Sequence, residues 1–242
     1  MTYQGKTYWI IGGSEGLGRA LAEALDAKGA RLILSARSED RLKEVAATLK
    51  NARAVVMDVT DEASVAQAYT AAGAVDGVIY VAGTYEPMTA QQWQAKSVST
   101  MFAVNLMGAV FVLNHIVPEF TKRDAGHIVL IGSLSGHRGL PGAIGYGASK
   151  AGLMHLAQTL YADLHKSGVR VQCANPGFIR TRLTDKNDFD MPMLMEPKEA
   201  AAHVMRAMDS GRFETNFPRP FSWLFSLSHF IPRRIFLKIT GA

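Results

Sequence analysis

The segment Thr7–Gly18 reads TYWIIGGSEGLG and joins five residues of high β-strand propensity to a glycine-rich loop. A stretch with apolar residues at helical spacing, Leu17–Lys28, follows at once and ends before Gly29. In such a strand–loop–helix unit, free backbone N–H groups and the positive end of the helix dipole can hold a pyrophosphate. We therefore predict a dinucleotide site formed by Gly12, Ser14, Glu15, Gly16, Leu17 and Gly18.

The rest of the chain repeats this alternation of strand and helix. Near-continuous apolar runs, typical of parallel strands covered on both faces, occur at Thr7–Ile11, Arg31–Ser35, Ala54–Met57, Gly77–Val81, His127–Ile131 and Arg170–Ala174. Helical patterns include Leu17–Lys28, Asp40–Lys50, Val98–Thr121 and Ala148–Lys166. We predict an α/β fold with a single Rossmann-type, doubly wound parallel sheet and helices on both faces. This context favours the nucleotide site over a glycine-rich turn without a ligand.

The choice of nucleotide depends on the end of the second predicted strand, which reads LSARS over residues 34–38. An acidic residue there would bind the ribose 2′-hydroxyl of NAD, whereas a nearby arginine accepts the 2′-phosphate of NADP. The segment has no acid, and Arg37 with Ser38 offers a phosphate pocket, so we predict that NADP(H) is preferred over NAD(H). Glu15 would repel that phosphate unless Arg37 neutralises it. A solvated Arg37 at a helix start is the alternative.

A group of three residues later in the chain suggests acid–base chemistry. Tyr146 and Lys150 are four residues apart at the start of a predicted helix, so their side chains share one face. The phenol has an unperturbed pKa of about 10, and a neighbouring ammonium group is expected to lower it. Ser133 ends a predicted strand and can hold the carbonyl oxygen that Tyr146 protonates. A tyrosine–lysine pair alone arises by chance on many helices, but the glycine loop and the strand-end serine favour a catalytic one.

Together these motifs resemble the short-chain dehydrogenase/reductase family, in its compact single-domain branch. The likeness covers about residues 5–212, and it is carried in order by Gly12/Gly16/Gly18, Asp58-Val59, Ala82-Gly83, Asn105, Ser133, Tyr146/Lys150 and Pro176-Gly177 with Thr181. The resemblance implies an NADP(H)-dependent oxidoreductase that interconverts a carbonyl and a secondary alcohol by hydride transfer.

The resemblance also implies a role for each matching residue. Tyr146 would be the general acid in reduction and the base in oxidation, while Lys150 would lower its pKa and bind the nicotinamide ribose. Ser133 would orient the substrate carbonyl, and Asn105 would keep a helix kinked around a water of the proton relay. The cofactor would also contact Asp58, Val59, Ala82, Gly83, Pro176, Gly177, Ile179 and Thr181.

Composition limits the remaining possibilities. The chain has 242 residues and a formal net charge of +5. Residues 213–242 hold four basic residues against one acidic residue, so the basicity belongs to one end and does not indicate nucleic-acid binding. The single cysteine, Cys173, excludes an internal disulfide and a cysteine cluster that could hold a metal. No apolar run approaches the ~20 residues that span a bilayer. We expect no signal peptide, a cytoplasmic location and no metal.

We divide the chain into a dinucleotide-binding and catalytic domain, residues 1–212, and an aromatic, basic appendage, residues 213–242. The methionine-rich segment Met191–Met195 suggests an adaptable apolar substrate pocket, and His137 and Arg138 are interpreted as solvated loop residues. The appendage could touch a membrane surface, cover the substrate entrance or pack against a partner subunit. The apolar helix Val98–Thr121 suggests a homo-oligomer, a dimer or a tetramer.

Two other functions compete with the oxidoreductase. A catalytically silent NADP(H)-sensing or scaffold protein could keep the same fold. Isomerase or dehydratase chemistry on nucleotide sugars usually needs a larger substrate domain. The complete set of Asn105, Ser133, Tyr146 and Lys150 favours the oxidoreductase, because a sensor has no need of Tyr146.

Overall fold

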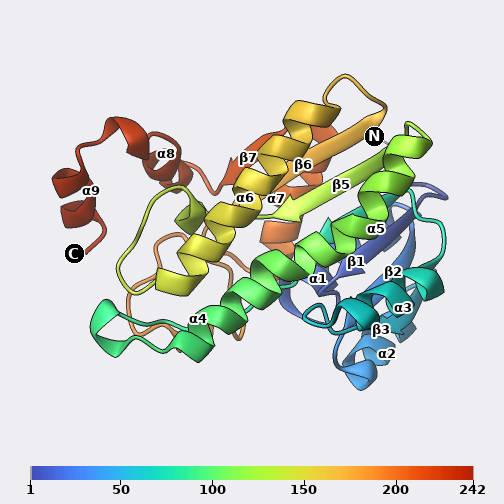
Figure 1. Ribbon diagram of the computed structural model, residues 1–242, viewed down its shortest axis with the longest axis horizontal. Helices are drawn as coiled ribbons and strands as arrows, with labels where there is room; N and C mark the ends of the chain where they lie inside the picture. Colours follow the sequence, from blue (N-terminus) through green and yellow to red (C-terminus); the bar gives the residue numbers. More distant parts are fainter. Residues whose placement is uncertain (1, 242) are drawn as a thin grey trace.

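A seven-stranded, all-parallel sheet forms the centre of the protein (Figure 1). The computed structural model describes residues 2–241. The strands stand in the order β3-β2-β1-β4-β5-β6-β7. Their bounds are β1 Thr7–Ile11, β2 Arg31–Ala36, β3 Ala52–Val56, β4 Gly77–Tyr80, β5 Gly126–Ile131, β6 Val169–Pro176 and β7 Glu214–Phe217. The order reverses its direction between β1 and β4, which is where a doubly wound sheet binds its ligand.

Helices cover both faces of the sheet, which confirms the predicted Rossmann-type α/β fold. One face packs against α1 (Gly16–Ala27), α2 (Glu39–Ala47) and α7 (Pro197–Ser210). The other face, toward the viewer in Figure 1, packs against α3 (Glu62–Ala72), α5 (Gly108–Lys122) and α6 (Ile144–Leu164). Alternate residues of each strand supply the two cores. In β1, Tyr8 and Ile10 face the first core while Trp9 and Ile11 face the second, so the strand must be apolar throughout.

The predicted helix Val98–Thr121 is continuous in space but not regular. It comprises α4 (Ala95–Phe102), a π-helical turn over Ala103–Met107, and then α5. A π turn widens the helix by one residue and often marks a functional site. The stretch Ala95–Lys122 is also long and apolar enough to cross a membrane, contrary to our expectation that no such run exists. Its contacts with α3 and α6 show that it packs as one layer of this fold.

The C-terminal segment begins inside the sheet. β7 pairs in parallel with β6, from Cys173 opposite Glu214 to Pro176 opposite Phe217. The sheet therefore extends into residues 213–242, which the sequence analysis placed outside the catalytic domain. Beyond β7 the chain forms α8 (Phe221–Ser226), a 3₁₀ turn over Ser228–Phe230 and α9 (Arg233–Ile239). These last elements protrude beside the loop that follows β5 (Figure 1).

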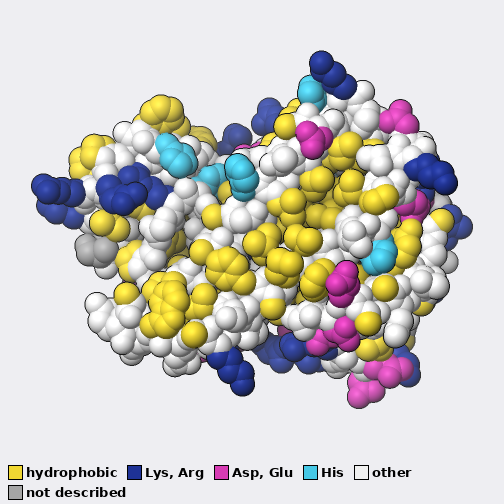
Figure 2. All heavy atoms as spheres, viewed as in Figure 1, with side chains coloured by type: hydrophobic (Ala, Val, Ile, Leu, Met, Phe, Trp, Pro, Cys, Tyr) yellow, Lys and Arg dark blue, Asp and Glu magenta, His cyan; other side chains and the backbone are white. Residues whose placement is uncertain are grey.

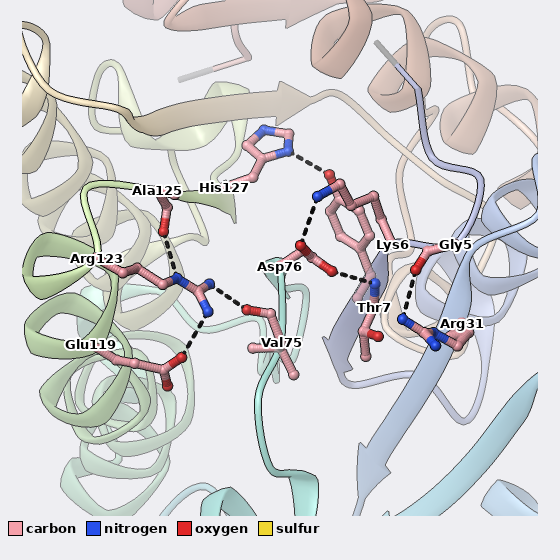
Figure 3. A network of polar contacts seen from close by, with 11 residues as sticks. Gly5, Lys6, Thr7, Arg31, Val75, Asp76, Glu119, Arg123, Ala125 and His127 are labelled. Atoms are coloured by element: carbon pink, nitrogen blue, oxygen red, sulfur yellow. Dashed lines mark hydrogen bonds and ion pairs between the residues drawn. The ribbon is translucent and has the colours of Figure 1, made fainter.

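Polar contacts connect the segments at the amino-terminal ends of the strands (Figure 3). Lys6 pairs with Asp76 at 2.9 Å, and the Asp76 carboxylate also accepts a hydrogen bond from the backbone N–H of Thr7. The buried ring of His127 contacts the hydroxyl of Tyr8 at 2.9 Å. Because this end of the sheet is occupied by structural contacts, the opposite end is left for a ligand.

Candidate active site

A cavity of about 610 Å³ opens at the carboxyl ends of the strands. Every residue that the sequence analysis assigned to the cofactor lies on its wall, from Gly12 in the glycine loop to Thr181 after β6. Of the four residues assigned to catalysis, Tyr146 and Lys150 line the cavity, whereas Ser133 and Asn105 are buried and do not line it. The structure thus gathers segments distant in sequence around one space large enough for a dinucleotide.

The glycine loop can approach a ligand because side chains are excluded from it. Gly12 has a φ of +96°, and a Cβ there would lie 2.7 Å from the backbone nitrogen of Ala82. A Cβ on Gly18 would lie 2.0 Å from the carbonyl oxygen of Gly12. The helix α1 begins at Gly16, and the side chain of its N-cap residue, Glu15, makes no capping hydrogen bond. The N–H groups of the first turn therefore remain available to a phosphate.

Glu15 is neutralised, but not by the arginine we expected. Its carboxylate pairs with Arg41 at 2.8 Å and with Arg182 at 2.6 Å. Arg37 is exposed and forms no ion pair with any residue of the described chain. The sequence analysis missed Arg41 and Arg182. Arg41 stands one helical turn after Arg37, a spacing that could have revealed it, whereas Arg182 comes from a loop 167 residues away from Glu15.

Asp58 lies on the same wall as Arg37. Burial acts to raise the pKa of the Asp58 carboxyl, but hydrogen bonds from Thr60 and the charge of Arg37 hold it below its usual value. Asp58 is therefore ionised at neutral pH. Basic side chains still outnumber acidic ones on the cavity wall, where Arg37, Arg41, Lys150, Arg182 and Lys186 face Glu15 and Asp58.

Tyr146 and Lys150 occupy the first turns of α6, on the face that meets the cavity. The Lys150 Nζ lies 5.9 Å from the centroid of the Tyr146 ring and donates a hydrogen bond of 2.8 Å to the carbonyl oxygen of Ile131. The side chain is buried, and this burial lowers the pKa of Lys150 to about 8. The ammonium group is therefore held in place by the end of β5 and keeps its charge at neutral pH.

Burial raises the pKa of the Tyr146 phenol, and a side-chain hydrogen bond with Ser133 lowers it by a smaller amount. The net direction is opposite to the one expected from the Tyr146–Lys150 spacing. The physical reason is that the cavity wall removes water from the phenol, while the Lys150 ammonium is directed at a backbone carbonyl. The Ser133 Oγ also accepts a hydrogen bond from the Ser135 hydroxyl at 2.9 Å, so it is oriented from both sides.

Asn105 stands in the π turn and is fully buried. Its Oδ1 accepts a hydrogen bond from the Thr84 N–H at 2.7 Å, and its Nδ2 donates to the Thr84 carbonyl at 3.0 Å. Nδ2 also donates to the Ser149 Oγ at 2.9 Å, and this hydroxyl in turn donates to the Tyr146 carbonyl at 2.9 Å. Asn105 thereby joins three segments: the loop after β4, the π turn and the helix that carries Tyr146.

Aromatic side chains contact one another around the cavity residues. The ring of Tyr85 meets the ring of Tyr146 edge-on, with centroids 5.1 Å apart. Phe178, which stands between the cavity residues Gly177 and Ile179, contacts Phe189 and Phe221 at centroid distances of 5.9 and 6.0 Å. The sequence analysis missed Tyr85, because only the fold brings it to Tyr146.

The residues of the methionine-rich segment Met191–Met195 differ in burial. Met195 is buried and its N–H donates a hydrogen bond to the Phe178 carbonyl, whereas Met193 is 45% exposed with a φ of +54°.

His137 and Arg138 are not solvated loop residues. The His137 ring contacts Asn216 at 3.1 Å, and Arg138 donates a hydrogen bond to the Ile231 carbonyl at 2.7 Å. Both residues attach the C-terminal segment.

The sheet, the glycine loop and the cavity at the strand ends define a Rossmann-type α/β protein. The family model for short chain dehydrogenase matches residues 6–191. An uncharacterized oxidoreductase of Myxococcus xanthus is 35% identical over 224 residues, which cover 88% of this chain and 87% of that protein. The chain therefore belongs to the short-chain dehydrogenase family and is an oxidoreductase of that family.

Solved structures show the same architecture. A short-chain dehydrogenase from Sphingobium yanoikuyae in complex with NADPH is 26% identical, with a TM-score of 0.83 over 94% of this chain and 97% of that one. A short chain dehydrogenase/reductase from Burkholderia phymatum in complex with NAD is 24% identical, with a TM-score of 0.86 over 95% of each chain. At 24% identity, the similarity to the Burkholderia phymatum structure shows a shared fold alone. Similar structures thus hold either nicotinamide cofactor.

Proposed function

We propose that the protein is an NADP(H)-dependent oxidoreductase that interconverts a carbonyl and a secondary alcohol on an apolar substrate. The observation that carries this proposal is the position of Tyr146 and Lys150, four residues apart on α6, on the wall of the cavity that the glycine loop also borders. A nicotinamide cofactor, when bound, supplies the hydride to the carbonyl carbon or accepts it from the alcohol.

The side chains of this end of the cavity handle the proton. Tyr146 donates its hydroxyl proton to the carbonyl oxygen during reduction, and the raised pKa keeps the phenol protonated for that step. Ser133 holds the same oxygen through its hydroxyl. Lys150, fixed by the Ile131 carbonyl, places a positive charge near the phenolate that forms and a donor near the ribose. Asn105 keeps the helix of Tyr146 in position through Ser149.

Two arginines support the preference for NADP(H). Arg37 lines the cavity, where its charge acts on Asp58 but no ion pair holds it, and Arg41 stands one helical turn further along the chain, on α2. A guanidinium group binds a phosphate through two parallel hydrogen bonds, each charge-assisted. Since no acidic residue follows β2 directly, nothing there favours the free 2′-hydroxyl of NAD.

The cofactor preference is tested by titrating Arg37→Ala with NADPH and with NADH. Loss of one charge-assisted contact should weaken NADPH by roughly 10- to 100-fold and NADH by less than about threefold. Arg206→Ala, an exposed arginine on α7 outside the cavity, is the matched control and should change neither affinity. Equal losses for both cofactors would remove Arg37 from the phosphate site.

The substrate is tested with a panel of carbonyl compounds and NADPH oxidation as the readout. The ring of Tyr85, in contact with Tyr146, predicts higher kcat/KM for apolar ketones and 3-oxoacyl compounds than for small polar ones. A catalytically silent sensor on the same fold would bind NADPH and oxidise it with none of them. That result would favour the catalytically silent sensor over the enzyme.

We also propose a cytoplasmic homo-oligomer, a dimer or a tetramer. Met107 and Val110 are exposed on the long helix formed by α4 and α5, and Figure 2 shows hydrophobic side chains gathered over this helix and α6. An exposed apolar face of this kind usually marks an interface. Light scattering of the purified protein measures the state, and a monomer at micromolar concentration would contradict the proposal.

A further inference from the structure

The segment after β7 forms a small module of its own, which we define as residues Phe221–Ile239. Phe225 and Phe236 are buried together against Leu134, the residue that follows Ser133. Arg138 bonds the carbonyl oxygens of Ser228 and Ile231, and its guanidinium lies 4.8 Å from the centre of the Phe236 ring. The module is therefore a packed part of the protein with a fixed outer surface.

That outer surface is apolar. Trp223, Leu227, Phe230, Ile235 and Ile239 have 54%, 55%, 85%, 51% and 56% of their surface exposed. Five of the twelve large exposed hydrophobic residues in the described chain thus fall within 17 residues. Trp223 and Leu227, the residue that follows α8, lie on one side of that helix, and Ile235 and Ile239 lie on one face of α9, because each pair is four residues apart.

Two serines of the module are buried. The side chains of Ser222 and Ser228 lie against the protein, while Trp223 and Leu227 are outside. Ser226 and His229 are exposed. The module therefore has apolar side chains both in its interior and on its outer surface.

The charge around this surface has one sign. Residues 217–242 contain no aspartate or glutamate, but they contain Arg219, Arg233, Arg234 and Lys238. All four side chains are exposed and form no ion pair among residues 2–241. Figure 2 shows basic and hydrophobic side chains side by side on this protruding part of the molecule.

We propose that the outer surface of this module docks on a bilayer of anionic phospholipid. Apolar and aromatic side chains with a basic border suit the boundary between lipid headgroups and acyl chains. A second copy of the same surface suits it poorly, because a two-fold contact would place these unpaired cations against each other. The docking does not depend on the cofactor or on the reaction.

The position of the module gives the docking a consequence for the site. Phe221 contacts Phe178 beside the catalytic end of the cavity, and Leu134 joins the module to Ser133. A membrane bound at the module would lie on the substrate side of the protein. If the substrate is apolar, as proposed above, it would reach the site from the lipid.

The experiment is sedimentation of the full-length protein with vesicles of phosphatidylcholine containing 30% phosphatidylserine. Arg233→Glu/Arg234→Glu is compared with Lys50→Glu/Lys166→Glu, which makes the same change of charge at exposed lysines elsewhere. Each basic residue near an anionic surface is worth about fivefold in affinity, so reversal of two should weaken binding at least 25-fold. The control should lose less than about fivefold, and 0.5 M salt should weaken the wild type.

A second measurement reports insertion directly. Trp223 and Trp93 have similar exposure, 54% and 57%. Vesicles with brominated acyl chains should quench the fluorescence of Trp93→Phe, which keeps Trp223, and should leave Trp223→Phe unchanged. Circular dichroism of each variant verifies that it is folded.

Three results would overturn the proposal: no binding of the wild type to the anionic vesicles, equal losses in both charge variants, or equal quenching in both tryptophan variants. A change of oligomeric state in Arg233→Glu/Arg234→Glu without a change in vesicle binding would assign the surface to a second copy instead.

Discussion

The most quantitative prediction concerns Asn105→Ala. Asn105 is fully buried, and its side chain makes three hydrogen bonds of 2.7, 3.0 and 2.9 Å to the Thr84 N–H, the Thr84 carbonyl and the Ser149 hydroxyl. The substitution leaves all three partner groups without this side chain. A buried polar group left unsatisfied costs about 1–3 kcal/mol. Thr84 is only partly buried and water can reach it, so we expect a total loss of about 3 kcal/mol in the free energy of unfolding.

For a chain of this size, 1 kcal/mol corresponds to roughly 2–4 °C in Tm, so Asn105→Ala should melt roughly 6–12 °C lower. Urea unfolding at pH 7 measures the free energy, and Asn51→Ala, an exposed asparagine, serves as the control with a loss under about 0.5 kcal/mol. Because Ser149 bonds the Tyr146 carbonyl, the folded fraction of Asn105→Ala should also turn over more slowly. A loss below about 1 kcal/mol would refute the view that Asn105 joins the three segments.

Two further predictions concern buried titratable groups. Lys150→Met removes the positive charge near Tyr146, so the limb of the pH–rate profile that reports the phenol should move to higher pH. An unchanged profile would show that Lys150 does not lower the pKa of Tyr146. Burial lowers the pKa of His127 to about 4, below its unfolded value of about 6.5, so its contribution to stability is complete above pH 6.5 and is lost as the pH falls toward 4. This loss amounts to roughly 3 kcal/mol, and urea unfolding of His127→Asn should show a correspondingly smaller fall between pH 7 and 4. An equal fall in the wild type and the variant would assign the loss to another group.

Local chemistry explains what the sequence could predict. Four of the five residues of β1, Tyr8–Ile11, are buried apolar or aromatic residues because both faces of the strand are covered, and the glycines that follow are required by backbone contacts with Ala82 and within the loop. These constraints act over a few residues, so they are readable in one segment. The spacing of Tyr146 and Lys150 is local in the same way, since both stand on one helix.

Features that depend on distant contacts could not be predicted. β7 is a short edge strand, Glu214–Phe217, in which only Phe217 is buried, so its sequence shows no alternation that would distinguish it from a loop. The pairing of Glu15 with Arg182 requires that the loop after β6 lie over the glycine loop. The pKa of Tyr146 depends on burial, and spacing in the sequence does not report burial.

The most direct test of the proposed function is Tyr146→Phe, measured for both NADPH binding and turnover. The substitution removes only the hydroxyl that would deliver the proton, so the Kd for NADPH should stay within about threefold, while kcat falls by roughly 100-fold or more. Tyr161→Phe, an exposed tyrosine on the same helix, should change neither quantity. Turnover of Tyr146→Phe at the wild-type rate, with NADPH binding intact, would contradict the assignment of this site as the catalytic centre.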